Sequence, residues 1–287
     1  MESLRLNAMA KINLGLDVLR RREDGYHEVK MVMQTVGICD ELEFTKLTED
    51  CIRISTDKEE LPSDGNNLIY RAAKLMKDTY GIREGVAVKL QKNIPIAAGM
   101  AGGSTDAAAT IHGMDRIFGL GLSLEEKQRL GVKIGADVPY CLMGGTALSE
   151  GIGEVLTALP QAPDAFLVVA KPDINVSTKF VYENLHADRL TYHPDIDGMV
   201  ESIRNGDLKG ITDRMGNVLE TVTIKRYPVI AEMKAFLLRQ GAMNALMSGS
   251  GPTVFGVFDK EEDARRAYTA MVEQGNFTKQ VFLTKLI

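Results

Sequence analysis

A glycine-rich stretch at residues 95–109, PIAAGMAGGSTDAAA, constrains the fold of this chain more than any other feature. An alternating apolar run precedes it, and small residues suited to a helix follow it to about Phe118. Gly99, Gly102 and Gly103 can adopt positive φ angles and turn successive backbone N–H groups toward one ligand. Because a helix N-terminus also offers unpaired N–H groups, the stretch favours a phosphate-binding loop, with a tight structural loop as the alternative.

Composition narrows the class of protein. At 287 residues the chain has room for two ordinary domains, and 45% apolar with 25% charged residues is typical of a globular protein. Three cysteines, at positions 39, 51 and 141 and not clustered with histidines, favour a reducing cytoplasm over a disulfide framework or a zinc site. We expect no membrane span, no signal peptide and, at a net charge of −5, no nucleic-acid partner.

The N-terminal residues alternate. Every even position from Leu4 to Val18 is apolar, which predicts a half-buried strand or two strands in sequence. The odd positions share the other face, so Lys11 and Asn13 should project side by side, about 6.5–7 Å apart. Short or uncharged side chains surround Lys11, so a functional role competes here with an ordinary solvated lysine.

The first half of the chain continues with predicted strands at residues 29–38, 40–47, 51–56 and 86–90. An amphipathic helix is expected at 68–80, capped by Asn66 or Asn67 and ended by Gly81. A capping box of Ser123 and Glu126 opens a helix that should end at Gly135. Strands at 143–149 and 154–159 complete this half.

Two prolines in a short polar segment at 159–164 predict a domain boundary, with domains at residues 1–160 and 161–287. Beyond it, strands are expected at 166–170, 245–247, 253–258 and 280–285. Helices are expected at 177–185 and 261–274, with two or three more within 196–240. This order predicts a ferredoxin-like α+β sandwich with inserted helices.

Several residues could carry chemistry. The glycine-rich stretch lacks the Gly-Lys-Ser/Thr ending of a Walker A motif, so any lysine that serves a phosphate must come from elsewhere. Ser104 and Thr105 could bind phosphate or lie near Mg²⁺, or they could cap the helix. Asp106, expected in the first helical turn, suits the helix dipole with or without a metal role. Asp137 could be a general base or could make a local turn hydrogen bond.

A second loop rich in glycine and serine lies at residues 248–252. Two such loops in different predicted domains suggest a nucleotide bound between the domains. Tyr26, His27 and Tyr182 are far apart in the sequence and, taken singly, would be ordinary core or surface residues.

Five blocks, in order along the chain, resemble the GHMP kinases, the small-molecule kinases named for galactose, homoserine, mevalonate and phosphomevalonate. The blocks are AKINL at 10–14, DGYHE at 24–28, the stretch 95–109, GADVP at 135–139 and SGSGP at 248–252. Within the family they look most like the branch that phosphorylates the 2-hydroxyl of 4-diphosphocytidyl-2-C-methyl-D-erythritol. The resemblance implies an α+β, two-domain GHMP kinase fold, with an N-terminal half like ribosomal protein S5 domain 2, a ferredoxin-like C-terminal half and the active site between them.

The same resemblance implies residue roles. Asp137 would be the base and Lys11 its charged partner, with Asn13 on the substrate side. Tyr26 and His27 would recognise cytosine, and Tyr182 would form the opposite face. ATP and Mg²⁺ are the implied cofactors, and the 2-phosphate product belongs to the non-mevalonate route to isoprenoids. The implied ATP-binding residues are Pro95, Ile96, Ala97, Ala98, Gly99, Met100, Ala101, Gly102, Gly103, Ser104 and Thr105; metal ligands and oligomeric state are not implied.

Three positions depart from the common family pattern, in which Gly, Ser and Asn stand where this chain has Ala101, Thr105 and Asp106. An alanine at 101 predicts a negative φ there. A carboxylate at 106, close to a triphosphate, needs Mg²⁺ or a lysine to offset its charge, so we expect it to tighten the Mg²⁺ requirement.

Other interpretations remain open at this point. The chain could be another metabolite kinase of the same family, such as a homoserine or mevalonate kinase. It could also be a catalytically silent nucleotide-binding protein on the same fold, although the presence of both Lys11 and Asp137 favours an enzyme. An RNA-binding role for the S5-like half is disfavoured by the acidic balance and the lack of a basic-aromatic stripe.

Overall fold

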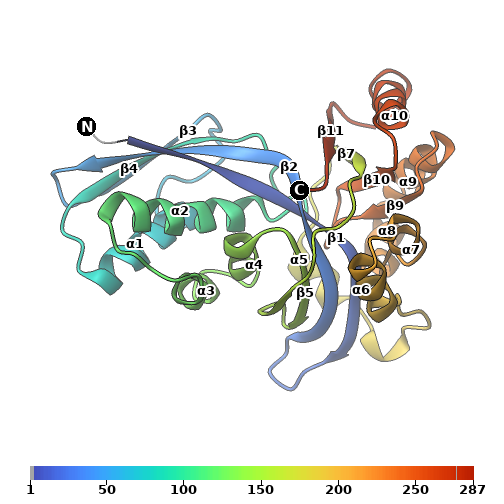
Figure 1. The fold of residues 1–287 in the computed structure, drawn as a ribbon, viewed down its shortest axis with the longest axis horizontal. Helices are drawn as coiled ribbons and strands as arrows, with labels where there is room; N and C mark the ends of the chain where they lie inside the picture. The colour runs from blue at the N-terminus through green and yellow to red at the C-terminus, as the bar shows by residue number, and fades with distance from the viewer. Residues whose placement is uncertain (1–2, 276) are drawn as a thin grey trace. The chain divides into compact units, whose positions relative to one another are not determined.

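The computed structural model describes residues 3–275 and 277–287; Met1 and Glu2, the start of the predicted N-terminal domain, lie outside the described residues. Figure 1 labels most of the elements, whose order along the chain is as follows: β1 Ser3–Arg21, β2 His27–Leu47, β3 Ile52–Thr56, α1 Leu68–Tyr80, β4 Gly85–Gln91, α2 Gly102–Phe118, α3 Leu124–Val132, α4 Val138–Met143, β5 Thr146–Gly151, β6 Val155–Ala158, β7 Phe166–Lys171, α5 Thr178–Glu183, a 3₁₀ turn η1 Ala187–Arg189, α6 Ile196–Arg204, α7 Leu208–Asp213, β8 Gly216–Asn217, α8 Glu220–Arg226, α9 Val229–Arg239, β9 Asn244–Met247, β10 Val254–Phe258, α10 Glu261–Gln274 and β11 Gln280–Lys285.

The described chain packs as two compact units, each assembled from separate stretches. Unit 1 holds the described residues up to Ala10, then residues 38–94 and 101–144. Unit 2 holds residues 11–37, 95–100 and 145–287, apart from the undescribed position 276. The units follow packing rather than chain order, and the sequence boundary near residue 160 stays a prediction.

The long strands β1 and β2 run through both units, in a sheet of order β3-β4-β2-β1-β8 with β5 also paired to β2 and β6 to β5. The separate strands predicted at 29–38 and 40–47 were wrong, because β2 continues through Asp40. Aspartate disfavours strands, but Asp40 is fully buried and its Oδ1 accepts the N–H groups of Asn93 and Ile94 at 2.6 and 2.8 Å. These bonds compensate for its poor strand propensity.

In unit 1, α1 and α2 pack together against strands β3 and β4 (Figure 1). The predicted ends of α1 are confirmed: the Asn67 side chain accepts the N–H of Ile69 at 2.9 Å, and Gly81 ends the helix with a φ of 65°. Helix α2 approaches β2 so closely that a Cβ on Gly113 would lie 2.7 Å from the Phe44 ring. Small residues therefore allow α2 to lie tightly on the sheet.

The region after α2 differs from expectation in part. The capping box of Ser123 and Glu126 is confirmed, but α3 ends at Val132 rather than Gly135. Residues 138–143 form the short helix α4, with Pro139 in its first turn, where a helix tolerates proline. Six residues are too few to show helical periodicity, so the sequence did not predict this helix.

In unit 2, the second sheet has the order β11-β7-β10-β9, with antiparallel neighbours throughout. In chain order these are its fourth, first, third and second strands, which confirms the predicted ferredoxin-like arrangement. Helix α9 packs on this sheet where a Cβ on Gly256 would lie 3.2 Å from Leu237. Four helices, α6 to α9, replace the two or three predicted between residues 196 and 240.

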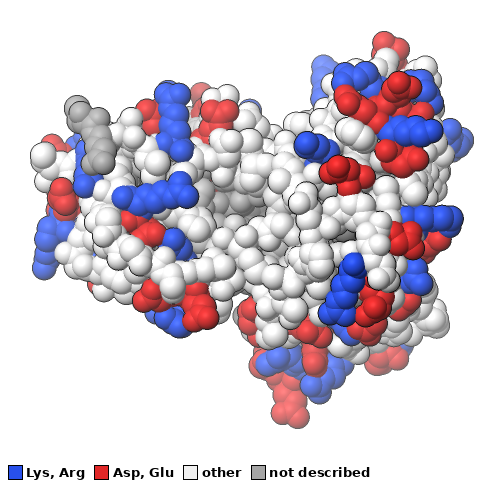
Figure 2. Space-filling model, in the orientation of Figure 1, with Lys and Arg blue, Asp and Glu red and all other residues white. Residues whose placement is uncertain are grey.

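The surface mixes charges of both signs. On the face in Figure 2, Lys and Arg alternate with Asp and Glu over α9 and α10. Within the described part of the chain, no helix combines the length and apolarity that a membrane span requires.

Candidate active site

The glycine-rich loop has an alternating backbone. Ala97, Gly99 and Ala101 adopt left-handed φ angles of 51°, 70° and 57°. The prediction of a negative φ at Ala101 was therefore wrong, and Gly102, which begins α2, and Gly103 are helical rather than left-handed. Alternation of left- and right-handed residues turns successive N–H groups into one concavity, the geometry that binds anions. The left-handed conformations of Ala97 and Ala101 each cost about 1–2 kcal/mol in backbone strain.

The loop leads into the open N-terminus of α2. The N-cap residue is Ala101, and no side chain among the described residues caps the first turn. The capping alternative for Ser104 and Thr105 was thus wrong; instead the Thr105 hydroxyl donates to the carbonyl of Met9 in β1 at 2.7 Å. The first N–H groups of α2 and its positive dipole end are available to a phosphate.

The two glycine-rich loops, far apart in the sequence, lie in direct contact within unit 2. The Ser248 hydroxyl donates to the carbonyl of Gly99 at 2.9 Å. A Cβ on Gly99 would lie 2.3 Å from the carbonyl oxygen of Ser248, so only glycine fits there. Asn217 anchors the second loop, because its side-chain nitrogen donates to the carbonyls of Met247 and Gly249 at 2.8 Å each.

Lys11 and Asn13 lie side by side on β1, as predicted. Both are buried, and the Lys11 ammonium donates to Oδ1 of Asn13 at 2.8 Å. The backbone N–H of Lys11 also donates to the carbonyl of Met100 at 3.2 Å, which ties this strand to the glycine-rich loop. Burial and the bond to Asn13 therefore fix the position of the Lys11 side chain.

Asp137 is the N-cap residue of α4 and is half-buried. Within the described structure its side chain makes no capping bond, so the local-turn alternative for Asp137 is not supported. Its backbone conformation is fixed by the following helix, since its carbonyl accepts the N–H of Cys141 at 3.0 Å. The carboxylate is therefore held on a rigid backbone.

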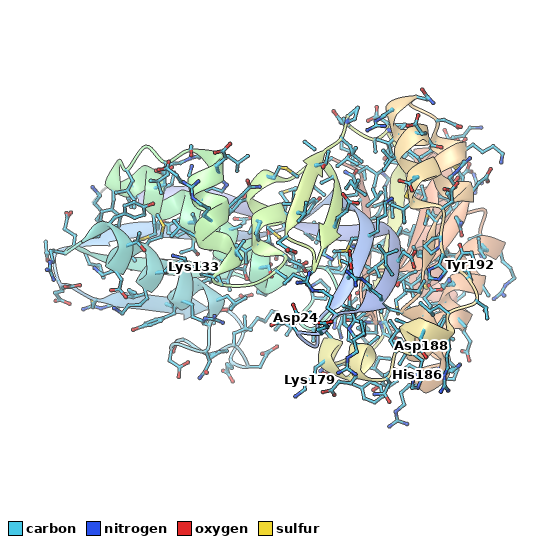
Figure 3. The ribbon with its side chains drawn as sticks, turned by 90° about the horizontal axis from the view of Figure 1, so that it is seen from below. Asp24, Lys133, Lys179, His186, Asp188 and Tyr192 are labelled. Atoms are coloured by element: carbon cyan, nitrogen blue, oxygen red, sulfur yellow. The ribbon has the colours of Figure 1, made fainter. Side chains whose placement is uncertain are left out.

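The aromatic residues gather where the β1–β2 hairpin meets α5. The ring centroids of His27 and Tyr182 lie 5.2 Å apart at an angle of 40°, while Tyr26 is 61% exposed. Burial, followed by the nearby charge of Arg21, lowers the pKa of His27, so its imidazole is neutral near pH 7. Figure 3 labels Asp24, in the hairpin turn, and Lys179 and His186, on and just after α5, in this region.

A charge cluster in unit 1 was not anticipated. The Lys92 ammonium pairs with Asp40 and, at 2.7 Å, with Oδ2 of Asp106, and all three side chains are more than 90% buried. Asp106 is the fifth residue of α2, just beyond the first turn in which it was predicted. Mg²⁺ or a lysine was expected to offset the charge of Asp106, and the structure places a lysine, Lys92, against it. Lys92 lies 52 positions from Asp40 and 14 positions from Asp106, so no local sequence signal links the three residues.

The fold and these loops define a class of protein. Family models for the GHMP kinases N terminal domain and the GHMP kinases C terminal domain match residues 67–145 and 199–276. A solved homoserine kinase from Cytophaga hutchinsonii shares the fold, with a TM-score of 0.79 at 20% identity, covering 100% of this chain and 98% of that one.

Closer relatives carry a single name. Proteins called 4-diphosphocytidyl-2-C-methyl-D-erythritol kinase from Lachnoclostridium phytofermentans and Lachnospira eligens are 53% and 54% identical over 285 residues, covering 99% of this chain and 98% and 99% of theirs. A crystal structure of 4-(cytidine 5'-diphospho)-2C-methyl-D-erythritol kinase matches with a TM-score of 0.84 at 30% identity, covering 99% of each chain. The chain belongs to this family of GHMP kinases.

Proposed function

We propose that this chain transfers the γ-phosphoryl group of ATP to the 2-hydroxyl of 4-diphosphocytidyl-2-C-methyl-D-erythritol, giving the 2-phosphate and ADP. The observation that carries the proposal is near-complete coverage, at about half identity, by relatives that bear this kinase name. The reaction belongs to the non-mevalonate route to isoprenoid precursors. We assign it to the cytoplasm, where ATP is available.

The phosphates of ATP would bind to residues 95–105. Support comes from the left-handed φ angles at 97, 99 and 101, a backbone pattern that can gather N–H groups around an anion, and from the uncapped start of α2. Within the described residues no three acidic, histidine or cysteine side chains form a metal cluster. This fits Mg²⁺ held mainly by substrate phosphates and water with one or two carboxylates, where it would neutralise phosphate charge.

The chemical step assigns one task to each side chain. The 2-hydroxyl oxygen forms a bond to the γ-phosphorus while the bond from that phosphorus to the bridging oxygen breaks, and ADP leaves with the electron pair. Asp137 accepts the hydroxyl proton and later releases it to solvent. Lys11 supplies positive charge to the transferring group, which its buried position beside Asn13 on β1 supports.

Recognition of the cytidine end would fall to Tyr26, His27 and Tyr182. Support comes from the contact between the His27 and Tyr182 rings and from the exposure of Tyr26, which leaves a ring face open for a base. A neutral His27 can both donate and accept a hydrogen bond, as a pyrimidine edge requires.

The proposal is tested by ADP release with the purified full-length chain, ATP and Mg²⁺. The acceptors are 4-diphosphocytidyl-2-C-methyl-D-erythritol, mevalonate and homoserine, each offered separately. Turnover should be confined to the cytidine substrate. Preference for mevalonate or homoserine would assign the chain to another GHMP kinase activity, and absence of turnover on all three would favour a silent nucleotide-binding protein.

A further inference from the structure

Beneath the start of α2, the buried cluster of Lys92, Asp40 and Asp106 joins two carboxyl groups to one cation. A Cβ on Gly102, the first residue of α2, would lie 3.0 Å from the Lys92 ammonium. The cluster therefore touches the helix turn to which the proposed function assigns ATP phosphate. The net charge of the cluster therefore affects how strongly that phosphate would bind.

The two carboxyl groups are not equivalent. Both oxygens of Asp40 are hydrogen-bonded, because they accept from the N–H groups of Asn93 and Ile94 and from Lys92. Asp106 has Lys92 on Oδ2, while Oδ1 is buried without a hydrogen-bond partner among the described residues. An ionised carboxylate would pay the full desolvation cost at that oxygen.

We propose that Asp106 is a positioning residue held as a neutral acid, so that Lys92 and Asp40 balance each other and the cluster carries no net charge beneath the phosphate-binding turn. The inference rests on the proposed function. If Asp106 ionised, the cluster would gain one negative charge beside the turn and would oppose a triphosphate.

The titration of Asp106 agrees with this geometry. Burial, opposed by the Lys92 charge and reinforced by Asp40, raises the pKa of Asp106 to about 8. Two carboxylates that share one site cannot both ionise readily.

Charged groups on the other elements packed against α2 are engaged elsewhere. Helix α1 buries apolar residues toward α2, and its buried Lys77 pairs with Asp50. Lys127 of α3 pairs with Asp115 near the far end of α2, and His112 binds a carbonyl of α4. Beside burial, the groups that act on the protonation of Asp106 are therefore Lys92 and Asp40.

The test is the pH dependence of ATP binding by the full-length chain, measured by calorimetry without acceptor from about pH 7 to about pH 9.5. Wild-type affinity should fall about tenfold as Asp106 ionises, which corresponds to a shift of one pKa unit on binding. Asp106→Asn, which keeps a neutral amide in place of the acid, should bind within about twofold of wild type at pH 7 and show no such fall. Asp115→Asn, which removes a buried carboxylate from the same helix, should keep the wild-type profile.

Two further results separate the outcomes. A protonated-carboxyl band in the infrared spectrum at pH 7 that Asp106→Asn removes would support the neutral acid in a way that a purely structural role would not. A flat wild-type profile, or an Asp106→Asn profile parallel to wild type, would overturn the inference even with normal kinase activity. Failure to turn over the cytidine substrate with the predicted ATP profile intact would overturn the proposed substrate alone.

Discussion

The positions and backbone conformations of single residues could be predicted from local sequence patterns only in part. The alternation along β1 predicted that Lys11 and Asn13 lie together, and the bond between them confirms it. The left-handed Ala101 was not predictable, because an alanine gives no sign that its surroundings hold it at positive φ. Asp106 likewise meets Lys92 through tertiary packing that no local pattern records.

Removal of the proposed base gives the first prediction. Asp137→Asn should lower kcat about 10²–10⁴-fold, because the amide cannot accept the hydroxyl proton. The Asp137 side chain does not cap α4, so the substitution removes no capping bond from this helix. Lys11→Ala should lower kcat by about 10²–10³-fold through lost charge stabilisation. Near-normal turnover in either variant, measured by ADP release, would refute the role assigned to that residue.

Tyr26 gives a prediction about substrate affinity. Stacking on a base is worth about 1–3 kcal/mol, so Tyr26→Ala should raise KM for the cytidine substrate by about tenfold or more. The exposed ring contributes little to folding, and kcat at saturation should stay near wild type. Tyr80→Ala, which removes a partly exposed tyrosine of α1, is the control and should leave this KM unchanged. An equal effect of both substitutions would count against the assignment.

At the scale of elements, long periodic segments were predictable and short or non-local ones were not. The bounds of α1 follow from its caps and periodicity, whereas α4 has only six residues. The strand β2 continues through Asp40 because partners from a distant segment compensate for aspartate. The two-residue strand β8 exists only through its pairing with β1.

Contact between the two glycine-rich loops is testable with a matched pair of variants. Gly99 and Gly81 have similar φ angles of 70° and 65°, but only Gly99 has a neighbour where a Cβ would go. Gly81→Ala should cost about 1–2 kcal/mol in the free energy of unfolding, from backbone strain alone. Gly99→Ala should cost about 2–5 kcal/mol and weaken ATP binding, because the loops must separate. Equal costs in urea unfolding would show that the contact contributes nothing.

At the scale of the whole molecule, five ordered sequence blocks indicated the family, and the fold confirms its ferredoxin-like sheet. Sequence order did not reveal that residues 95–100 pack with the C-terminal segment, because that grouping depends on contacts such as Ser248 to Gly99. Non-local contacts of this kind leave no periodic signal.

The raised pKa of Asp106 also predicts how the stability of the whole molecule depends on pH. Its pKa is about 8 when folded, against an ordinary value of 3.8. Between these values the folded chain keeps a proton that the unfolded chain has released, so stability from this group is lost as pH rises, by at most about 1.4 kcal/mol per pH unit. As pH rises from about 5 to about 8, the free energy of unfolding of Asp106→Asn should therefore increase relative to that of wild type by about 1–4 kcal/mol. A constant difference in urea unfolding at the two pH values would contradict this.

The most direct test of the proposed reaction is the position of the new phosphate, read from the ³¹P spectrum of the product. Carbon 2 of the methylerythritol carries a methyl group and no hydrogen. A 2-phosphate should therefore give a phosphomonoester signal without three-bond coupling to a carbinol proton, formed in step with ADP. A phosphomonoester coupled to such a proton, or no phosphomonoester at all, would contradict the proposed reaction.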